Sequence, residues 1–240
     1  MSMKVATAFL SYTPTASTEA TDHPATNLAL YDRPQRTWRS TSAAGSITLG
    51  GSGSVAAVFL NNANFATVDI SGGAFTSAGI PVPVDLRVAR RKIWIETPAA
   101  SLPLTLTPHT PDGGAGFYEL GVAVVLGTVV ELSDWPSFPR WTPKQARTIT
   151  PFPSGGREIN EDGPLYLEWT LRNDQFIRSD AVPVLAELLA VIGAGAAATP
   201  VIWENRGPTE HAYLFQRLED PPFQEDFVTF GAELTFTEAI

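Results

Sequence analysis

The fold of this chain is constrained most by a succession of short apolar segments separated by glycine- or proline-rich turns. In the first unit, residues 1–134, the segments predicted as strands are 4–10, 46–50, 55–62, 65–71, 92–97, 102–108, 117–127 and 128–132. Turn sequences fall between several of them, at 50–54, 71–75 and 111–116. The unit has no convincing amphipathic helix pattern. Many short strands with such turns predict an antiparallel β-sandwich.

Residues 17–65 contain a more specific series of motifs. A Pro-Ala-x-Asn-Leu turn is followed by Trp-Arg-Ser, by a strand ending in Leu-Gly and by a second strand of alternating apolar residues. The matching positions are Pro24, Ala25, Asn27, Leu28, Trp38, Arg39, Ser40, Leu49, Gly50, Val58, Leu60 and Asn61. In this order the motifs resemble the opening of the discoidin-like, galactose-binding-like jelly rolls, and residues 117–127 resemble the last strands of that fold. The resemblance implies a jelly-roll β-sandwich with structural positions at Asn27, Trp38, Arg39, Leu49 and Gly50.

Domains of this kind often bind sugars or lipids through their loop tips. Here the tips at 42–44, 52–53 and 72–73 carry small residues and lack the combination of an aromatic ring and Asp that grips a sugar. The resemblance therefore allows carbohydrate binding, which the tip residues themselves do not indicate. We expect Trp38 in the core rather than as a ligand platform. Asp22 and His23 are expected in a plain loop rather than in a ligand or metal site.

The second unit, residues 145–240, has a different order of elements. Residues 164–173 alternate between apolar and polar side chains, as in a half-buried strand. A helix is predicted next, because Leu185, Leu188, Leu189 and Ile192 follow helical spacing and Gly193 can end it. Further strands are predicted at 200–205, 211–218 and 227–239.

This order resembles the tail-tube-like folds of tailed bacteriophages, in which a β-sandwich or split barrel is flanked by one helix. The whole chain is similar to phage minor tail proteins of the distal tail type, which usually place the ring domain first, whereas here the galactose-binding-like sandwich precedes it. The resemblance implies a structural virion protein at the tail tip. Copies would form a ring, expected to be sixfold, that joins the tail tube protein to hub or baseplate proteins and lets DNA pass without specific binding. The alternative is a carbohydrate-binding module that attaches the tail to a host glycan.

The net charge of −9 is unevenly distributed along the chain. Residues 1–140 hold nine basic and ten acidic residues (−1), and residues 141–240 hold seven and fifteen (−8). The change falls at residues 135–144, which contain three prolines and two tryptophans and predict an extended connector. Acidic and hydroxyl groups facing a channel would repel DNA phosphates. The candidates for a lumen or ring surface are Glu168, Glu233, Thr235 and Thr237, and the alternative is an ordinary solvated sheet face.

Two charged clusters are candidates for contacts between copies. One is the basic run of Arg87, Arg90, Arg91 and Lys92, which could dock an acidic surface or could simply protect a sheet edge. The other is the acidic cluster of Glu219, Asp220, Glu225 and Asp226 around a pair of prolines. The cluster lacks the oxygen-ligand spacing of a calcium loop, so an exposed loop or an inter-subunit contact is expected rather than a metal or catalytic site.

Composition and missing motifs exclude several kinds of chemistry. The chain has no Cys and three His, which excludes cysteine nucleophiles and Cys-based zinc sites and leaves little for a histidine site. Phosphate-binding, dinucleotide-binding, nucleophile-elbow and HExxH motifs are all missing. We therefore expect no catalytic site, no metal and no cofactor. The N-terminus does not resemble a signal peptide and residues 181–202 are too interrupted to span a bilayer, which predicts a protein made in the cytoplasm. The resemblance to tail proteins implies that this is the host cytoplasm and that the protein is located in the virion.

Overall fold

The computed structural model describes residues 2–31, 35–86, 90–132, 140–144, 147–151, 157–161, 166–177, 201–205, 210–218, 223–225 and 229–238. The first part of the chain forms β1 (Ser2–Phe9), β2 (Thr13–Ala16), the 3₁₀ turn η1 (Ala25–Ala29), β3 (Trp38–Arg39), β4 (Ile47–Gly50), β5 (Ser54–Ala63), β6 (Phe65–Gly72), β7 (Phe75–Pro81), β8 (Val84–Asp85), β9 (Arg90–Ser101), β10 (Leu104–Pro111), η2 (Asp112–Gly114) and β11 (Glu119–Leu132). All strand pairings among the described residues are antiparallel. The prediction of a mainly β, antiparallel fold is confirmed.

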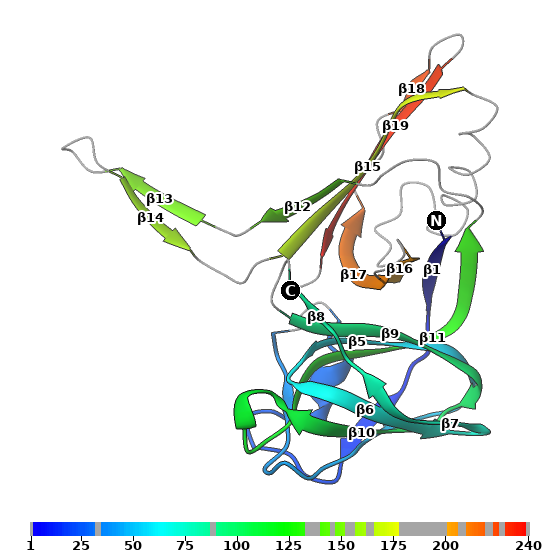
Figure 1. Cartoon of the computed structure of the whole chain (residues 1–240), viewed down its shortest axis with the longest axis vertical. Helices are drawn as coiled ribbons and strands as arrows, with labels where there is room; N and C mark the ends of the chain where they lie inside the picture. The colour runs from blue at the N-terminus through cyan, green and yellow to red at the C-terminus, as the bar shows by residue number, and fades with distance from the viewer. Residues whose placement is uncertain are drawn as a thin grey trace.

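Two layers of strands make the N-terminal jelly-roll sandwich (Figure 1). One layer is a five-stranded sheet in the order β2-β4-β10-β6-β7, and the other contains β1, β11, β5, β9 and β8 as neighbours. The core between the layers is apolar and includes Leu28, Trp38, Ile47, Leu49, Val58, Leu60, Phe65, Val68, Leu104 and Leu120. Trp38 is completely buried, so the expectation that it belongs to the core is confirmed.

The β1–β11–β5–β9 sheet is buried on its other face as well. Phe59, Val122, Val124 and Leu126 are 0% exposed, yet they belong to a second cluster, separate from the core between the layers. A strand that is buried on both faces has a nearly continuous apolar sequence rather than an alternating one. The runs at 55–60 and 121–126 have this character, which explains why their apolar content exceeds what one buried face requires.

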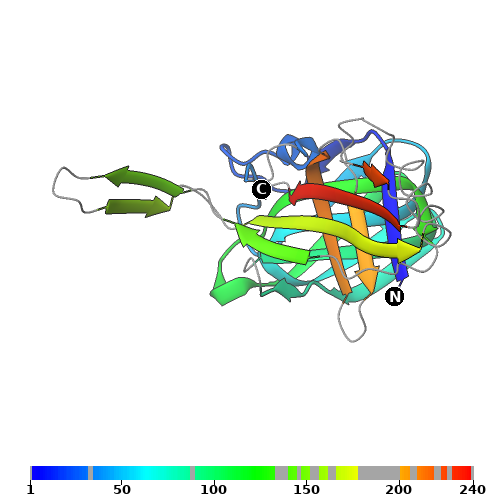
Figure 2. The ribbon, with the colours of Figure 1, turned by 90° about the horizontal axis from the view of Figure 1, so that it is seen from above.

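Apart from one separate two-stranded hairpin, the strands of the rest of the chain continue the same sheet. The strands of this part are β12 (Arg140–Lys144), β13 (Arg147–Pro151), β14 (Arg157–Glu161), β15 (Tyr166–Ile177), β16 (Val201–Asn205), β17 (Glu210–Leu218), β18 (Phe223–Glu225) and β19 (Thr229–Glu238). β16 pairs with β1, so the twelve-stranded sheet runs in the order β12-β15-β19-β17-β16-β1-β11-β5-β9-β8, with β3 and β18 added at its sides. β17 contacts β9, and both views show β16 and β17 lying over the sandwich (Figures 1 and 2).

Several predicted boundaries differ from the structure. The segments 117–127 and 128–132 form one strand, β11, and the predicted connector already contains a strand, because β12 pairs with β15. The hairpin of β13 and β14, as well as β2, β7, β8 and β18, was not predicted. The turn at 71–75 is confirmed: β6 ends at Gly72, and Gly73 has a φ of +59°, which favours glycine. The helix predicted around residues 183–193 lies outside the described residues.

Candidate functional site

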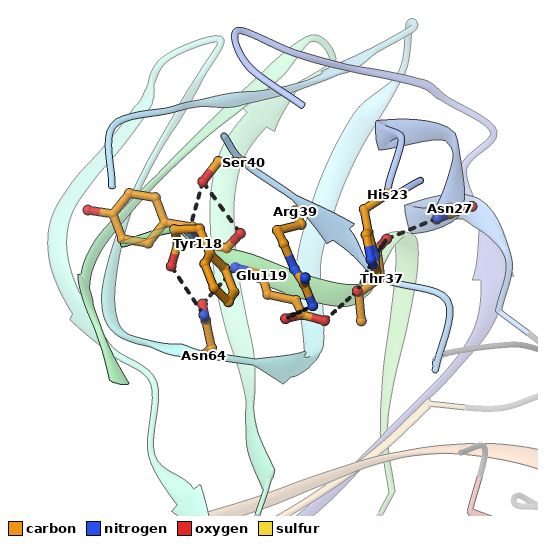
Figure 3. A network of polar contacts seen from close by, with 9 residues as sticks. His23, Asn27, Thr37, Arg39, Ser40, Asn64, Tyr118 and Glu119 are labelled. Carbon is orange, nitrogen blue, oxygen red and sulfur yellow. Dashed lines mark hydrogen bonds and ion pairs between the residues drawn. The ribbon is translucent and has the colours of Figure 1, made fainter. Parts of the chain in front are cut away.

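A network of polar side chains lies at the end of the sandwich where β5 ends and β11 begins (Figure 3). Its centre is Glu119, the first residue of β11. The Glu119 carboxylate accepts hydrogen bonds from the Thr37 hydroxyl and from Arg39 Nη2, the latter at 3.1 Å. Its backbone N–H donates to Asn64 Oδ1 at 2.6 Å. The network thereby joins β3, β11 and the residue between β5 and β6.

Thr37 connects this centre to the turn η1. The side-chain amide of Asn27 donates to the Thr37 carbonyl at 2.9 Å, and His23 Nδ1 lies 3.1 Å from Thr37 Oγ1. Asn27 therefore holds the turn through its amide nitrogen. His23 has structural partners in this loop, and its neighbour Asp22 is exposed.

Arg39 and Phe117 give this end of the sandwich its surface chemistry. The Arg39 guanidinium carbon lies 4.6 Å from the centroid of the Phe117 ring, in a cation–π arrangement. The Arg39 side chain is 35% exposed and that of Glu119 is 23% exposed. A cation, a carboxylate and an aromatic ring therefore meet at the surface. Such groups can hydrogen-bond and stack on a polar ligand.

Sequence reasoning missed the centre of this network. Arg39 and Asn27 were singled out as structural positions, and they do belong to it. Thr37, Asn64 and Glu119 were not, because Thr37 and Glu119 are 82 residues apart and meet only after β3 pairs with β11. Among the remaining structural positions, Leu49 is fully buried and Gly50 ends β4.

The basic run is divided among different environments. Arg91 makes a bidentate ion pair with Asp112, in which Nε and Nη2 each lie 2.8 Å from a carboxylate oxygen. Arg91 Nη1 also donates a hydrogen bond to the Val82 carbonyl at 2.6 Å. Lys92 is only 5% exposed and pairs with Asp85 at 3.1 Å. The place of Lys92 on β9 puts it on the covered face of the sheet, and a contact between copies through Lys92 stays a prediction. Arg87 lies outside the described residues, and a contact between copies through Arg90 stays a prediction.

The four candidates for a lumen or ring surface lie on two adjacent strands. In the β15–β19 pairing, Glu168 is opposite Thr237, Thr170 is opposite Thr235, and Arg172 is opposite Glu233. The structure thus brings Glu168, Glu233, Thr235 and Thr237 together on one ladder, as their alternation suggested. Lys144 of the neighbouring β12 lies 3.4 Å from the Glu168 carboxylate, so part of the acidic charge is neutralised. Whether this ladder faces a lumen stays a prediction.

The acidic cluster is mostly outside the described residues. Glu219, Asp220 and Asp226 lie outside the described residues. Glu225 is the last residue of β18 and pairs with Phe230 of β19. In the described part of the chain, no group of three or more metal-ligating side chains comes together. A helix with the length and apolar character to cross a membrane is likewise missing from that part.

Comparison with known proteins gives only distant structural similarity. No protein-family model and no curated protein matches the sequence. Among solved structures, chitosan-binding module 1 of a chitosanase/glucanase from Paenibacillus sp. IK-5 is 21% identical, with a TM-score of 0.37 over 49% of this chain and 96% of that one.

Two further structures each resemble about half of the chain. A family 32 carbohydrate-binding module of NanJ from C. perfringens, solved with galactose, is 16% identical, with a TM-score of 0.40 over 51% of this chain and 98% of its own. XRCC1 bound to the catalytic domain of DNA polymerase β is 14% identical, with a TM-score of 0.39 over 50% and 100%. Similarity at this level does not assign a ligand to the chain.

Proposed function

We propose that this protein is a structural subunit of the tail tip of a tailed bacteriophage, where copies assemble into a ring, expected to be sixfold, between the tail tube protein and the hub or baseplate. It acts without a catalytic step and without a cofactor. DNA passes through the ring without specific binding, past the acidic second unit. The protein is made in the host cytoplasm and located in the virion.

One observation carries this proposal: the β13–β14 hairpin projects away from the rest of the chain in both views (Figures 1 and 2). Among the described residues, its two strands pair only with each other. A two-stranded hairpin by itself is marginally stable in water, so a projecting hairpin gains stability when a neighbouring molecule packs against it. Strand edges that would be a liability in a monomer can then serve as contacts between copies.

The test removes the hairpin. Arg147 is paired with Glu161, so the two ends of the hairpin are adjacent, and a Gly-Gly link can replace residues 147–161 without displacing the flanking strands. We expect mass photometry of the full chain to show an oligomer and negative-stain images to show a central pore. The deletion variant should be monomeric with an unchanged β-rich circular dichroism spectrum. A full chain that stays monomeric at every concentration tested contradicts the proposal.

A second function is favoured by the arrangement of Arg39, Phe117 and Glu119 at the end of a galactose-binding-like sandwich. A guanidinium, a carboxylate and an aromatic ring are the groups that recognise sugar hydroxyls and ring faces. We propose host-glycan binding at this end as the alternative role. Glycan-array binding by the full chain, lost in Arg39→Ala and kept in the hairpin deletion, would support it, and an array without any binding would argue against it.

A further inference from the structure

The covered face of the large sheet, here called the outer face, is as well buried as the sandwich core. It consists of Ala6, Ala57, Phe59, Trp94, Val122, Val124 and Leu126 on β1, β5, β9 and β11. The sheet curls at β1 through the pairing with β16, and β17 then contacts β9 across this face. β16 is therefore attached to the sandwich by a strand ladder, and β17 lies over the outer face (Figure 1).

A polar side chain lies at one end of this apolar face. Asn61 of β5 is opposite Val122 of β11 on one side and Lys92 of β9 on the other. Asn61 is 0% exposed, and neither its amide nitrogen nor its carbonyl oxygen has a hydrogen-bond partner. The indole nitrogen of Trp94 is also buried without a partner. Trp94 is opposite Phe59, which makes it a diagonal neighbour of Asn61 on the same face.

The sandwich core differs from the outer face in this respect. No residue of the core cluster between the two layers is among the described side chains with buried, unpaired polar atoms. A buried polar atom without a partner loses its hydrogen bonds to water and forms none in the protein. This cost in free energy weakens the contact that buries the atom. Opening of the outer face would return water to the unpaired groups of Asn61 and Trp94, whereas the core cluster has no such unpaired group among the described side chains.

We propose that β16 and β17 close over the outer face reversibly, with the β1–β16 ladder as the hinge and the β9–β17 contact as the part that opens. Asn61 and Trp94 set the closing equilibrium, because their unpaired groups favour the open state. The sandwich itself stays folded during opening. This inference does not depend on the proposed function.

The chain has no cysteine, so a single introduced thiol reports on opening without background. Ala57 on the outer face and Ala123 in the sandwich core are both 0% exposed, and Ala→Cys adds one sulfur atom at each. We expect DTNB to label the Ala57→Cys variant at least about tenfold faster than the Ala123→Cys variant under native conditions. Equal rates would mean that both thiols react only after global unfolding, which overturns the proposal.

A second substitution tests the role of Asn61. Asn61→Leu removes the unpaired amide at similar volume, so it should slow labelling of the Ala57→Cys variant by about tenfold and raise the melting temperature of the otherwise unchanged chain. Asn64→Leu is the matched control, because the Asn64 amide is hydrogen-bonded to Phe117 O and to the Glu119 N–H and its loss should lower the melting temperature. An Asn61→Leu variant that is less stable than the wild type, or unchanged in labelling rate, overturns the proposal.

Discussion

Asp85 and Lys92 form a buried ion pair whose removal has a predictable cost. The carboxylate and ammonium lie 3.1 Å apart, and the side chains are 4% and 3% exposed. At an effective dielectric constant of about 20, two charges at this distance attract each other by roughly 5 kcal/mol. Burying both charges consumes much of that attraction, so the pair contributes little net stability. Removing one partner, however, leaves the other charge buried without the opposite charge that it faces at 3.1 Å.

Either single substitution, Asp85→Asn or Lys92→Met, should therefore lower the free energy of unfolding by roughly 3–5 kcal/mol. For a chain of this size, that corresponds to a fall in melting temperature of about 6–20 °C. The double variant should lose much less than the sum of the two, because it leaves no unpaired charge.

Urea denaturation of the wild type, both single variants and the double variant completes the thermodynamic cycle. Single variants that lose under about 1 kcal/mol would mean that water reaches the pair. Additive losses would mean that the two groups do not interact. Either result would refute the account of Lys92 as a buried, paired residue.

Two further predictions concern titrating groups. The Gly79 N–H and then His109 lower the pKa of Asp69, so the ionised Asp69 stabilises the fold above the ordinary carboxyl pKa, and this contribution is lost as the pH falls through the lowered value. Asp69→Asn should melt below the wild type at pH 6, and the difference should vanish in acid, as differential scanning fluorimetry would show. Burial, and then the nearby Tyr31, raises the pKa of Tyr12 well above its usual value. The protonated phenol therefore stabilises the fold up to about pH 10, and this stabilisation is lost at higher pH. Tyr12→Phe should lower the free energy of unfolding by about 1–3 kcal/mol at pH 7, because the Leu28 and Ala123 carbonyls lose their hydrogen-bond donor. Between pH 9 and 11, the free energy of unfolding of this variant should fall less than that of the wild type.

The sequence predicts the strands of the sandwich well because their signals are local. The boundaries of β4, β5 and β6 agree with the prediction within one residue, since each strand is flanked by glycine or by a short polar turn. β2 and β7 were missed because their side chains are mostly exposed and they lack an apolar run. The division of 117–132 into two strands followed Gly127, which the structure accommodates inside β11.

The site could not be predicted to the same extent because its contacts are long-range. Glu119 looked like an ordinary polar residue at the start of a strand, and only the pairing of β3 with β11 brings it to Thr37 and Arg39. Lys92 was assigned to the surface because it follows three arginines within six residues. Its environment depends on what covers the sheet, and alternation along β9 cannot reveal that the outer face is closed by strands more than 100 residues away.

The position of β1 explains why the two units of the sequence behave as one sheet. A jelly-roll strand at a sheet edge would leave one row of backbone groups unpaired. β1 instead pairs with β11 on one side and with β16 on the other, so the second unit completes the hydrogen bonding of the first. The same arrangement covers Phe59, Val122 and Val124, which the sandwich alone would leave in water. The change in charge at residues 135–144 therefore separates two stretches of sequence, one nearly neutral and one acidic, that both contribute strands to one continuous sheet.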